Sequence, residues 1–182
     1  MKATGIVRRI DELGRVVIPK EIRRTLRMRE GTPLEIYTEK EGELIFKKYS
    51  PIVELEDFAL EYAESICQFT EHIVIITDMD TILTVCGTNK KEYIGLPVSI
   101  DIEKIMHDRK SVISNKLEGA TIYPIKRDDE INYTAQILVP IIGDSECFGM
   151  VILASKEEKA LFTTAEIKVA QIAATFLASQ II

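Results

Sequence analysis

The stretch of sequence that decides the fold of the N-terminal part runs from residue 5 to residue 26 and reads GIVRRIDELGRVVIPKEIRRTL. In an extended segment Ile6 and Ile10 would lie on one side and Val7 on the other, which predicts a strand over Ala3–Ile10. The next four residues, Asp11–Gly14, predict a turn, because aspartate opens turns and glycine adopts a positive φ. A β-branched run predicts a second strand over Arg15–Ile18. Pro19 cannot donate to a strand ladder but suits the first turn of a helix, so a short helix is predicted over Lys20–Leu26.

The residues that follow complete a small β-rich module. Two further strands are predicted, Pro33–Tyr37 and Glu43–Tyr49, joined by a hairpin turn around Glu41-Gly42. Four short strands and two helical turns in about fifty residues bury too little apolar surface to offset their loss of chain entropy. The first fifty residues also contain no cysteine that could form a disulfide. We therefore predict that residues 1–50 fold only as a homodimer, with hairpins exchanged between the two chains.

Charge separates this module from the rest of the chain. Residues 1–50 contain twelve Lys or Arg against eight Asp or Glu, whereas residues 51–182 contain eleven against twenty-one. The whole chain has a net charge of −6, which taken alone argues against a polyanionic partner. A cationic module attracts nucleic acid by releasing condensed counterions, although a terminal charge cluster is often only a solvated face. The order of residues around the arginines favours the first interpretation.

The run Gly5–Pro19, together with Glu21–Leu26, closely resembles the swapped-hairpin DNA-binding domain of AbrB-type transition-state regulators. The later segments Leu34–Tyr37 and Lys47–Tyr49 also fit that domain. The resemblance implies a dimeric β-barrel to which both chains contribute strands. It also implies that arginines of this module form a basic surface that binds double-stranded DNA.

The DNA-contacting positions of that family are occupied here by Arg8, Arg15, Arg23 and Arg24, with Arg9 and Lys20 as basic neighbours. Arginine offers a planar fork of donors that suits phosphate oxygens and guanine edges. Because most contacts are expected to go to the DNA backbone, binding should depend steeply on salt and only modestly on sequence. Further basic residues, Lys20 among them, are either electrostatic helpers or solvated charges: Lys2, Lys20, Arg27 and Arg29.

Ser50-Pro51 marks the boundary of the module, and residues 53–182 form an acidic second domain. Helices are predicted over Val53–Glu71, Asn89–Tyr93 and Asp101–Arg109. A closing helix opens with a capping box between Thr163 and Glu166. The predicted strands are His72–Thr77, Thr81–Gly87, Ala120–Ile125, Tyr133–Ile142 and Cys147–Ser155. This order predicts an α+β fold with a central antiparallel sheet flanked by helices.

The same order of elements, with the apolar runs Ile137–Ile141 and Phe148–Leu153, resembles a GAF domain. The resemblance implies a domain that senses an unidentified small molecule or binds another protein, and it transfers no ligand contact to a particular residue. Both flanking helices are apolar over more than a narrow stripe, so one side can cover the sheet while another pairs with a second copy. We therefore expect a homotetramer that combines the N-terminal dimer with self-association of the second domain.

Several classes of site are not predicted. The three cysteines, Cys67, Cys86 and Cys147, are scattered and form neither a disulfide framework nor a zinc pattern. Cys67 and Cys147 are interpreted as core residues and Cys86 as the more exposed one. Because no P-loop, GxSxG or HExxH motif occurs, we expect no catalytic residue, cofactor or metal. No signal peptide or membrane-spanning run occurs either, so we expect a cytoplasmic, nucleoid-associated protein with no membrane partner.

An AbrB-type module joined to a GAF-like domain resembles the transcription regulators that activate some sporulation genes and repress others in spore-forming bacilli. Two other functions stay open at this point. Some GAF-type domains reduce free methionine sulfoxide with a thiolate, but scattered cysteines without an adjacent basic cluster do not favour that chemistry. Related swapped-hairpin domains act as antitoxins, but a folded second domain here takes the place of a disordered toxin-binding tail.

Overall fold

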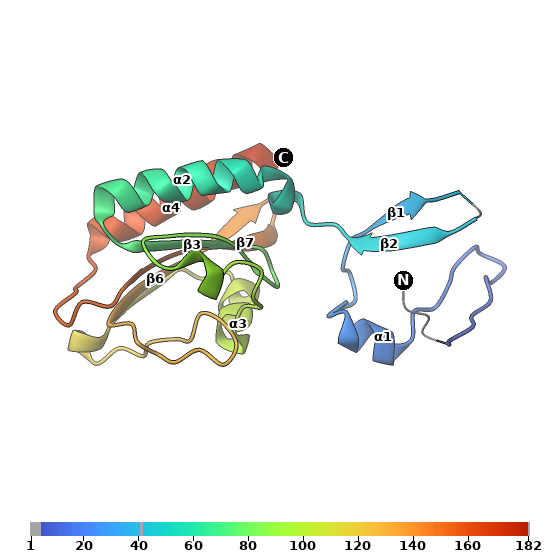
Figure 1. Cartoon of the computed structure of the whole chain (residues 1–182), viewed down its shortest axis with the longest axis horizontal. Coiled ribbons are helices and arrows are strands. Elements are labelled where there is room, and N and C mark those ends of the chain that lie inside the picture. The colour runs from blue at the N-terminus through green and yellow to red at the C-terminus, as the bar shows by residue number, and fades with distance from the viewer. Residues whose placement is uncertain (1–4, 41, 182) are drawn as a thin grey trace. The chain divides into compact units, whose positions relative to one another are not determined.

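The computed structural model of the chain describes residues 5–40 and 42–181. The chain divides into two compact units, Met1–Tyr49 and Ser50–Ile182 (Figure 1). In its described residues the first unit forms one short helix, α1 (Lys20–Thr25), and two strands, β1 (Leu34–Thr38) and β2 (Leu44–Lys48). The second unit contains a five-stranded sheet and the longer helices.

β1 and β2 form an antiparallel hairpin, as the sequence predicts. Ile36 pairs with Phe46 in the middle of the ladder, and the Glu39 amide donates to the Glu43 carbonyl at 3.0 Å where the strands end. Gly42 lies in the turn with φ +82°, a value that glycine adopts without a steric penalty. The predicted turn also includes Glu41, which lies outside the described residues.

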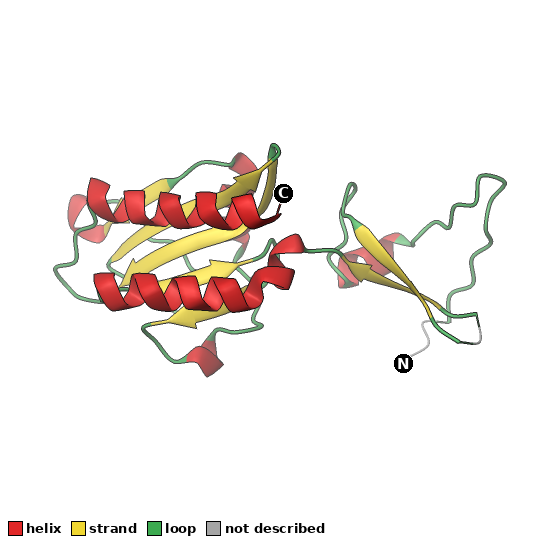
Figure 2. Cartoon of the chain, turned by 90° about the horizontal axis from the view of Figure 1, so that it is seen from above, coloured by secondary structure: helices red, strands yellow, loops and turns green. Residues whose placement is uncertain are grey.

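The strands predicted over residues 3–10 and 15–18 are wrong for the described residues, because residues 5–19 contain no strand (Figure 2). Residues 3 and 4 lie outside the described range. The turn between them does form: the Gly14 amide donates to the Asp11 carbonyl, and the Asp11 amide donates to the Arg15 carbonyl, both at 3.0 Å. A strand requires a ladder of hydrogen bonds to a neighbouring backbone, and a single chain offers these segments no such ladder.

The described residues of the first unit form no apolar core of their own. Among its described residues only Pro19 is buried. Its exposed large apolar side chains are Ile6, Val7, Ile10, Leu13, Val16, Val17, Leu26, Ile36, Tyr37, Leu44, Phe46 and Tyr49. An isolated two-stranded hairpin is marginally stable in water, and this much exposed apolar surface is typical of a protein interface. The exposed apolar side chains, and not only the short length of residues 1–50, therefore indicate that this unit pairs with a second chain.

The second unit is built on an antiparallel sheet with the strand order β4-β3-β7-β6-β5. The strands are β3 (Ile73–Thr77), β4 (Ile82–Cys86), β5 (Val112–Asn115), β6 (Ala135–Gly143) and β7 (Glu146–Ser155). β3, β6 and β7 are buried over most of their length, which fits their nearly continuous runs of apolar residues. The predicted α+β fold with a central antiparallel sheet is confirmed.

Helices cover both faces of this sheet. α2 (Glu56–Thr70) and α4 (Thr164–Ile181) lie side by side on one face (Figures 1 and 2). The 3-10 helix η1 (Pro51–Leu55) directly precedes α2 in the chain. The Tyr62 and Phe176 rings stack between α2 and α4 with centroids 4.8 Å apart. α3 (Ile100–Asp108) lies on the opposite face, so the sheet separates two apolar cores. Two further 3-10 turns are η2 (Lys90–Glu92) and η3 (Lys116–Glu118).

The strand predicted over Ala120–Ile125 is wrong, and β5 is the fifth strand instead. Residues 120–125 run as a loop that a buried side chain holds against the sheet. The Gln136 amide accepts from the Tyr123 N–H and donates to the Tyr123 carbonyl, both at 2.8 Å. A side-chain amide thus takes the place of a strand ladder at this position.

α4 begins with the predicted capping box. The Ala165 amide donates to Thr163 Oγ1 at 3.2 Å, and the Thr163 amide and hydroxyl donate to Glu166 Oε2 at 2.7 and 2.6 Å. The hydrogen bonds from Thr163 hold the pKa of Glu166 below its usual value, because they stabilise the ionised carboxylate. The amide bonds satisfy donors that have no partner inside the helix.

Candidate nucleic-acid interface

Arg8 and Arg9 lie on the segment that leads into the Asp11–Gly14 turn. Both residues are exposed, and their side chains make no hydrogen bond or ion pair within the described ranges. An exposed guanidinium without a carboxylate partner keeps its charge and its five donors available for a phosphate group. These two residues are therefore free to contact a polyanion.

Arg15 lies on the other side of the turn and is held there by Asp11. The Arg15 amide donates to Asp11 Oδ1, and Arg15 Nε donates to Asp11 Oδ2, both at 2.8 Å. The amide bond, followed by the guanidinium bond, holds the pKa of the Asp11 carboxyl below its usual value. The Arg15 side chain is nevertheless 70% exposed, and its terminal nitrogens make no bond to another described residue. Asp11 thus orients Arg15 without covering it.

Lys20, Arg23 and Arg24 come from α1, which begins directly after Pro19. The helix ends in a left-handed cap: the Met28 amide donates to the Arg23 carbonyl at 2.7 Å, and Arg27 adopts φ +53°. Arg23 and Arg24 lie in the last turn, where cations interact favourably with the helix dipole. All three basic side chains are exposed, and no described carboxylate pairs with them.

The six residues predicted to contact DNA are called the basic set from here on. They lie on two segments of the first unit. Arg8, Arg9 and Arg15 flank the turn, and Lys20, Arg23 and Arg24 share α1. Residues 16–19 connect the turn segment to α1, and both belong to the first unit. Five of the six have no carboxylate partner among the described residues, and Arg15 has one. This is a surface chemistry that suits an extended polyanion.

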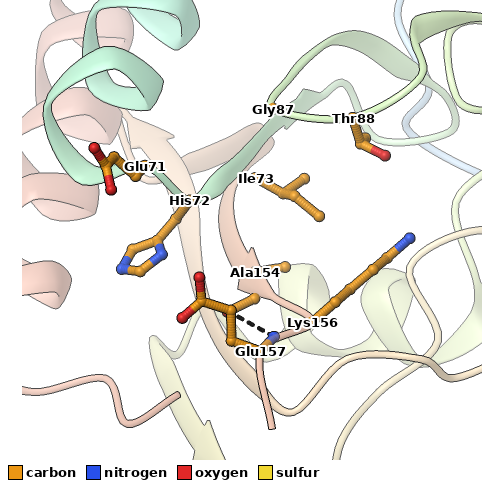
Figure 3. A pocket seen from close by; sticks show the side chains of 9 residues that line it. Glu71, His72, Ile73, Gly87, Thr88, Ala154, Lys156 and Glu157 are labelled. Atoms are coloured by element: carbon orange, nitrogen blue, oxygen red, sulfur yellow. Dashed lines mark hydrogen bonds between the residues drawn. The ribbon is translucent and has the colours of Figure 1, made fainter. Parts of the chain in front are cut away.

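The second unit contains a cavity of about 350 Å³ at the end of the sheet where α2 ends, β3 begins and β7 ends (Figure 3). Its lining mixes both signs of charge, with Glu71, His72, Lys156 and Glu157 beside Thr88. The His72 ring contacts the Phe162 ring at 4.7 Å, on the side of the closing helix. These residues come from distant parts of the chain, and no local motif predicts the cavity. In the part of the chain that the structure describes, no three metal-ligating side chains cluster.

Apolar side chains are exposed on the outer side of α2 and α4. A hollow of about 540 Å³ is lined by Lys168, Gln171, Ile172, Thr175, Phe176 and Ser179. Ile172 on α4 is exposed, as are Phe58 and Phe69 on α2. Such a surface is typical of contact with another protein. None of the described helices, α4 included, is long and apolar enough to cross a membrane.

A buried pair of tyrosine hydroxyls lies on the face of the sheet that α3 covers, and the sequence analysis did not predict it. The hydroxyls of Tyr93 and Tyr133 lie 2.7 Å apart, and Lys126 Nζ lies 4.8 Å from the Tyr93 ring centroid. Burial, and then the hydrogen bond that the Tyr133 hydroxyl shares with Tyr93, raise the pKa of Tyr133 well above its usual value. Lys126 also pairs with Asp129 at 3.9 Å. The two tyrosines are forty residues apart, so no spacing rule could have joined them.

Comparison with known protein families and relatives gives the following matches. Residues 54–182 match the family described as Stage V sporulation protein T C-terminal, transcription factor, and residues 7–53 match Antidote-toxin recognition MazE, bacterial antitoxin. The chain is 46% identical over 180 residues to Stage V sporulation protein T of Bacillus subtilis (strain 168), covering 99% of this chain and 98% of that protein. It is 63% identical over 51 residues to the Transition state regulatory protein AbrB of the same organism, covering 28% of this chain and 52% of the relative. The predicted resemblance to AbrB-type regulators is confirmed.

Solved structures share the fold. A methyl-accepting chemotaxis protein, residues 122 to 287, matches with a TM-score of 0.60 and 14% identity, covering 71% of this chain and 89% of that chain. The GAF domain from Acinetobacter phosphoenolpyruvate-protein phosphotransferase matches with a TM-score of 0.57 and 16% identity, covering 71% of this chain and 87% of that chain. At these identities the likeness shows the fold alone. It confirms the predicted GAF-like architecture.

Proposed function

This chain belongs to the stage V sporulation protein T family of transcription factors, and from that premise we propose that it binds double-stranded DNA through the basic set of residues 1–50. The observation that carries the proposal is the state of these side chains. Arg8, Arg9, Lys20, Arg23 and Arg24 are exposed without a carboxylate partner among the described residues. In a chain with a net charge of −6, such a concentration of unpaired cations at one end fits a polyanionic partner.

The binding form is a homodimer of the N-terminal module. Two arguments support it: the exposed apolar side chains of the first unit, and the segments around the Asp11–Gly14 turn that have no strand neighbour in one chain. Exchange of these segments between two chains would pair both backbones and bury apolar surface. It would also double the number of cations that face the DNA, which strengthens binding and its dependence on salt.

Residues 53–182 serve as a GAF-like sensor and oligomerisation domain. The exposed apolar side chains of α2 and α4, including Phe58, Phe69 and Ile172, support pairing with a second copy and therefore a homotetramer. The cavity beside His72 is the candidate position for a small-molecule signal. A signal acts only if it binds two states of the domain with different affinity, and it would then shift the protein between activation and repression of sporulation genes. In this proposal the protein acts on the nucleoid in the cytoplasm. It regulates transcription by binding and catalyses no reaction.

An antitoxin-like function is the second candidate, because residues 7–53 match an antitoxin family. Residues 50–182 form a compact folded unit, which leaves no disordered tail for toxin binding among the described residues. Co-purification from a sporulating culture distinguishes the two functions. A stoichiometric toxin partner would favour the antitoxin, whereas recovery of DNA fragments with the protein alone favours the regulator.

Binding to a labelled duplex, followed by fluorescence anisotropy at increasing KCl, tests the DNA-binding proposal. Each phosphate contact contributes about 0.9 to the slope of log K against log[salt]. Arg24→Ala removes one cation from each chain of the dimer, so the slope should fall by about 1.8 and the affinity should weaken at every salt concentration. Arg15→Ala should act in the same direction.

The matched control is Lys159→Ala, which removes one exposed cation from the second unit. We expect it to leave the affinity and the slope at their wild-type values. Sedimentation velocity checks that every variant keeps its oligomeric state. If Arg15→Ala and Arg24→Ala both bind DNA as the wild type does while remaining assembled, the basic set is not the DNA-binding surface.

A further inference from the structure

Two thiols that are far apart in sequence lie together between α2 and β4. Cys67 lies on α2, and Cys86 is the last residue of β4; both are half-buried and both pack against the core under α2 and α4. Cys86 pairs with Val74, whose side chain belongs to that same core, so the Cys86 side chain is on the sheet face that α2 covers. Cys67 Sγ lies only 3.2 Å from the point that a Cβ on Gly87 would occupy.

The chemistry of the two thiols agrees with this geometry. Burial raises the pKa of Cys67 to about 11, and the hydrogen bond and the charge of the Cys86 thiol add to the effect. Cys147, in contrast, packs with the core on the α3 face, where its thiol donates to the Gly149 carbonyl at 3.4 Å. The expectation that the three cysteines are scattered is therefore wrong for Cys67 and Cys86, which the tertiary fold brings together.

We propose that Cys67 and Cys86 are a redox-sensitive pair that forms a reversible intramolecular disulfide by exchange with a low-molecular-weight disulfide, RSSR. The thiolate of Cys86 attacks one sulfur of RSSR, which forms a mixed disulfide and releases RS⁻. Cys67 loses its proton and attacks the Cys86 sulfur, which releases the second RS⁻. The two released thiolates take up the two protons, so two protein thiols and one RSSR yield one protein disulfide and two RSH. Cys86 is only half-buried, so solvent reaches this end of β4.

The bond would tie the C-terminal end of α2 to β4, the edge strand of the sheet. It would close a loop of about twenty residues, which restricts the unfolded chain and should raise Tm of the second unit by roughly 5–10 °C. The exchange should accelerate with rising pH, because each attack requires a thiolate and the pKa of Cys67, which makes the second attack, is about 11. This site involves no residue of the basic set, so its test is independent of the DNA-binding proposal.

The full-length protein, reduced and then incubated with oxidised glutathione, provides the test. Intact mass under denaturing, non-reducing conditions should show a loss of about 2 Da per chain, the mass of two hydrogens, without a glutathione adduct. Trypsin leaves both cysteines in one fragment, residues 49–90, because no Lys or Arg lies between them. Cleavage after Glu71 separates Cys67 from Cys86 unless a disulfide joins the two peptides.

Three variants with single serine substitutions complete the experiment. Cys147→Ser should form the disulfide as the wild type does, whereas Cys67→Ser and Cys86→Ser should each stop at a glutathione adduct on the remaining thiol of the pair. The proposal is overturned if the wild type ends with separate adducts on Cys67 and Cys86, with a bridge that includes Cys147, or with a bridge between chains. It is also overturned if the two thiols stay fully reduced at pH 9 while free cysteine in the same tube is oxidised.

Discussion

Replacing Ile36 by alanine tests whether one face of the β1–β2 hairpin is buried in the dimer. Ile36 is 59% exposed, pairs with the exposed Phe46, and shares its face with the exposed Leu44. The substitution removes three methylene-sized groups, roughly 2.4 kcal/mol of apolar burial at about 0.8 kcal/mol each. If the dimer covers the exposed fraction, each chain loses about 1.4 kcal/mol and the dimer about 2.8 kcal/mol. The dissociation constant should therefore rise roughly a hundredfold.

Sedimentation equilibrium of the fragment 1–50 over a dilution series measures this constant, and circular dichroism at each concentration reports folding. The control is Glu35→Ala on the opposite face of the same strand, which should change the dissociation constant by less than about threefold. An Ile36→Ala fragment that dimerises like the wild type would refute the reasoning about this face. A wild-type fragment that is a folded monomer at micromolar concentration would refute the obligate dimer itself.

Three further substitutions test the second unit by urea unfolding of the full-length protein. Gly149→Ala places a Cβ 1.9 Å from the Thr77 carbonyl oxygen, so it should lower the free energy of unfolding by roughly 3 kcal/mol or more; wild-type stability would contradict the spacing of β3 and β7. Asn115→Ala removes the hydrogen-bond partner of both the Phe162 amide and the Phe162 carbonyl, each at 2.9 Å. It should lower the free energy of unfolding by roughly 2–4 kcal/mol. A decrease below about 0.5 kcal/mol would show that water replaces the side chain. Glu166→Gln keeps a side-chain acceptor but removes the negative charge near the helix N-terminus, so it should lower the free energy of unfolding by roughly 0.5 kcal/mol at pH 7. The pKa of Glu166 is depressed in the folded state, so the contribution of its charge is present above the unfolded pKa of about 4.3 and is lost as the pH falls through the lower folded pKa. The difference between variant and wild type should therefore shrink as the pH falls, and a difference that stays constant with pH would argue against a contribution from the Glu166 charge.

Local signals in the sequence predicted the elements whose physics is local. The Asp11–Gly14 turn, the β1–β2 hairpin and the Thr163–Glu166 capping box all form as predicted. Each depends on hydrogen bonds between residues at most a few positions apart, or on a hairpin whose turn sets the register. The residues of the basic set were proposed as DNA contacts in another way, from the resemblance of one ordered run of residues to AbrB-type domains.

Two sequence predictions were wrong because the partner of each segment in the folded protein cannot be identified from the amino-acid sequence. Residues 120–125 are rich in β-branched and aromatic residues, as strands are, but Gln136 bonds to the Tyr123 backbone and holds them as a loop. The segments on either side of the Asp11–Gly14 turn have the composition of strands but have no neighbouring backbone in one chain. In both cases the state of a segment depends on which partner reaches its backbone, and composition does not identify that partner.

The amino-acid sequence alone therefore determined the basic N-terminal module, its relation to AbrB-type regulators, and the order of helices and strands in the second unit. Only the tertiary structure decided that Cys67 and Cys86 are neighbours, that Tyr93 and Tyr133 share a buried hydrogen bond, and that a charged cavity lies beside His72. The physical reason is range. Turns, caps and periodicity act between residues close in the chain, whereas these sites arise where the packing of a helix or loop on a sheet brings distant residues into contact.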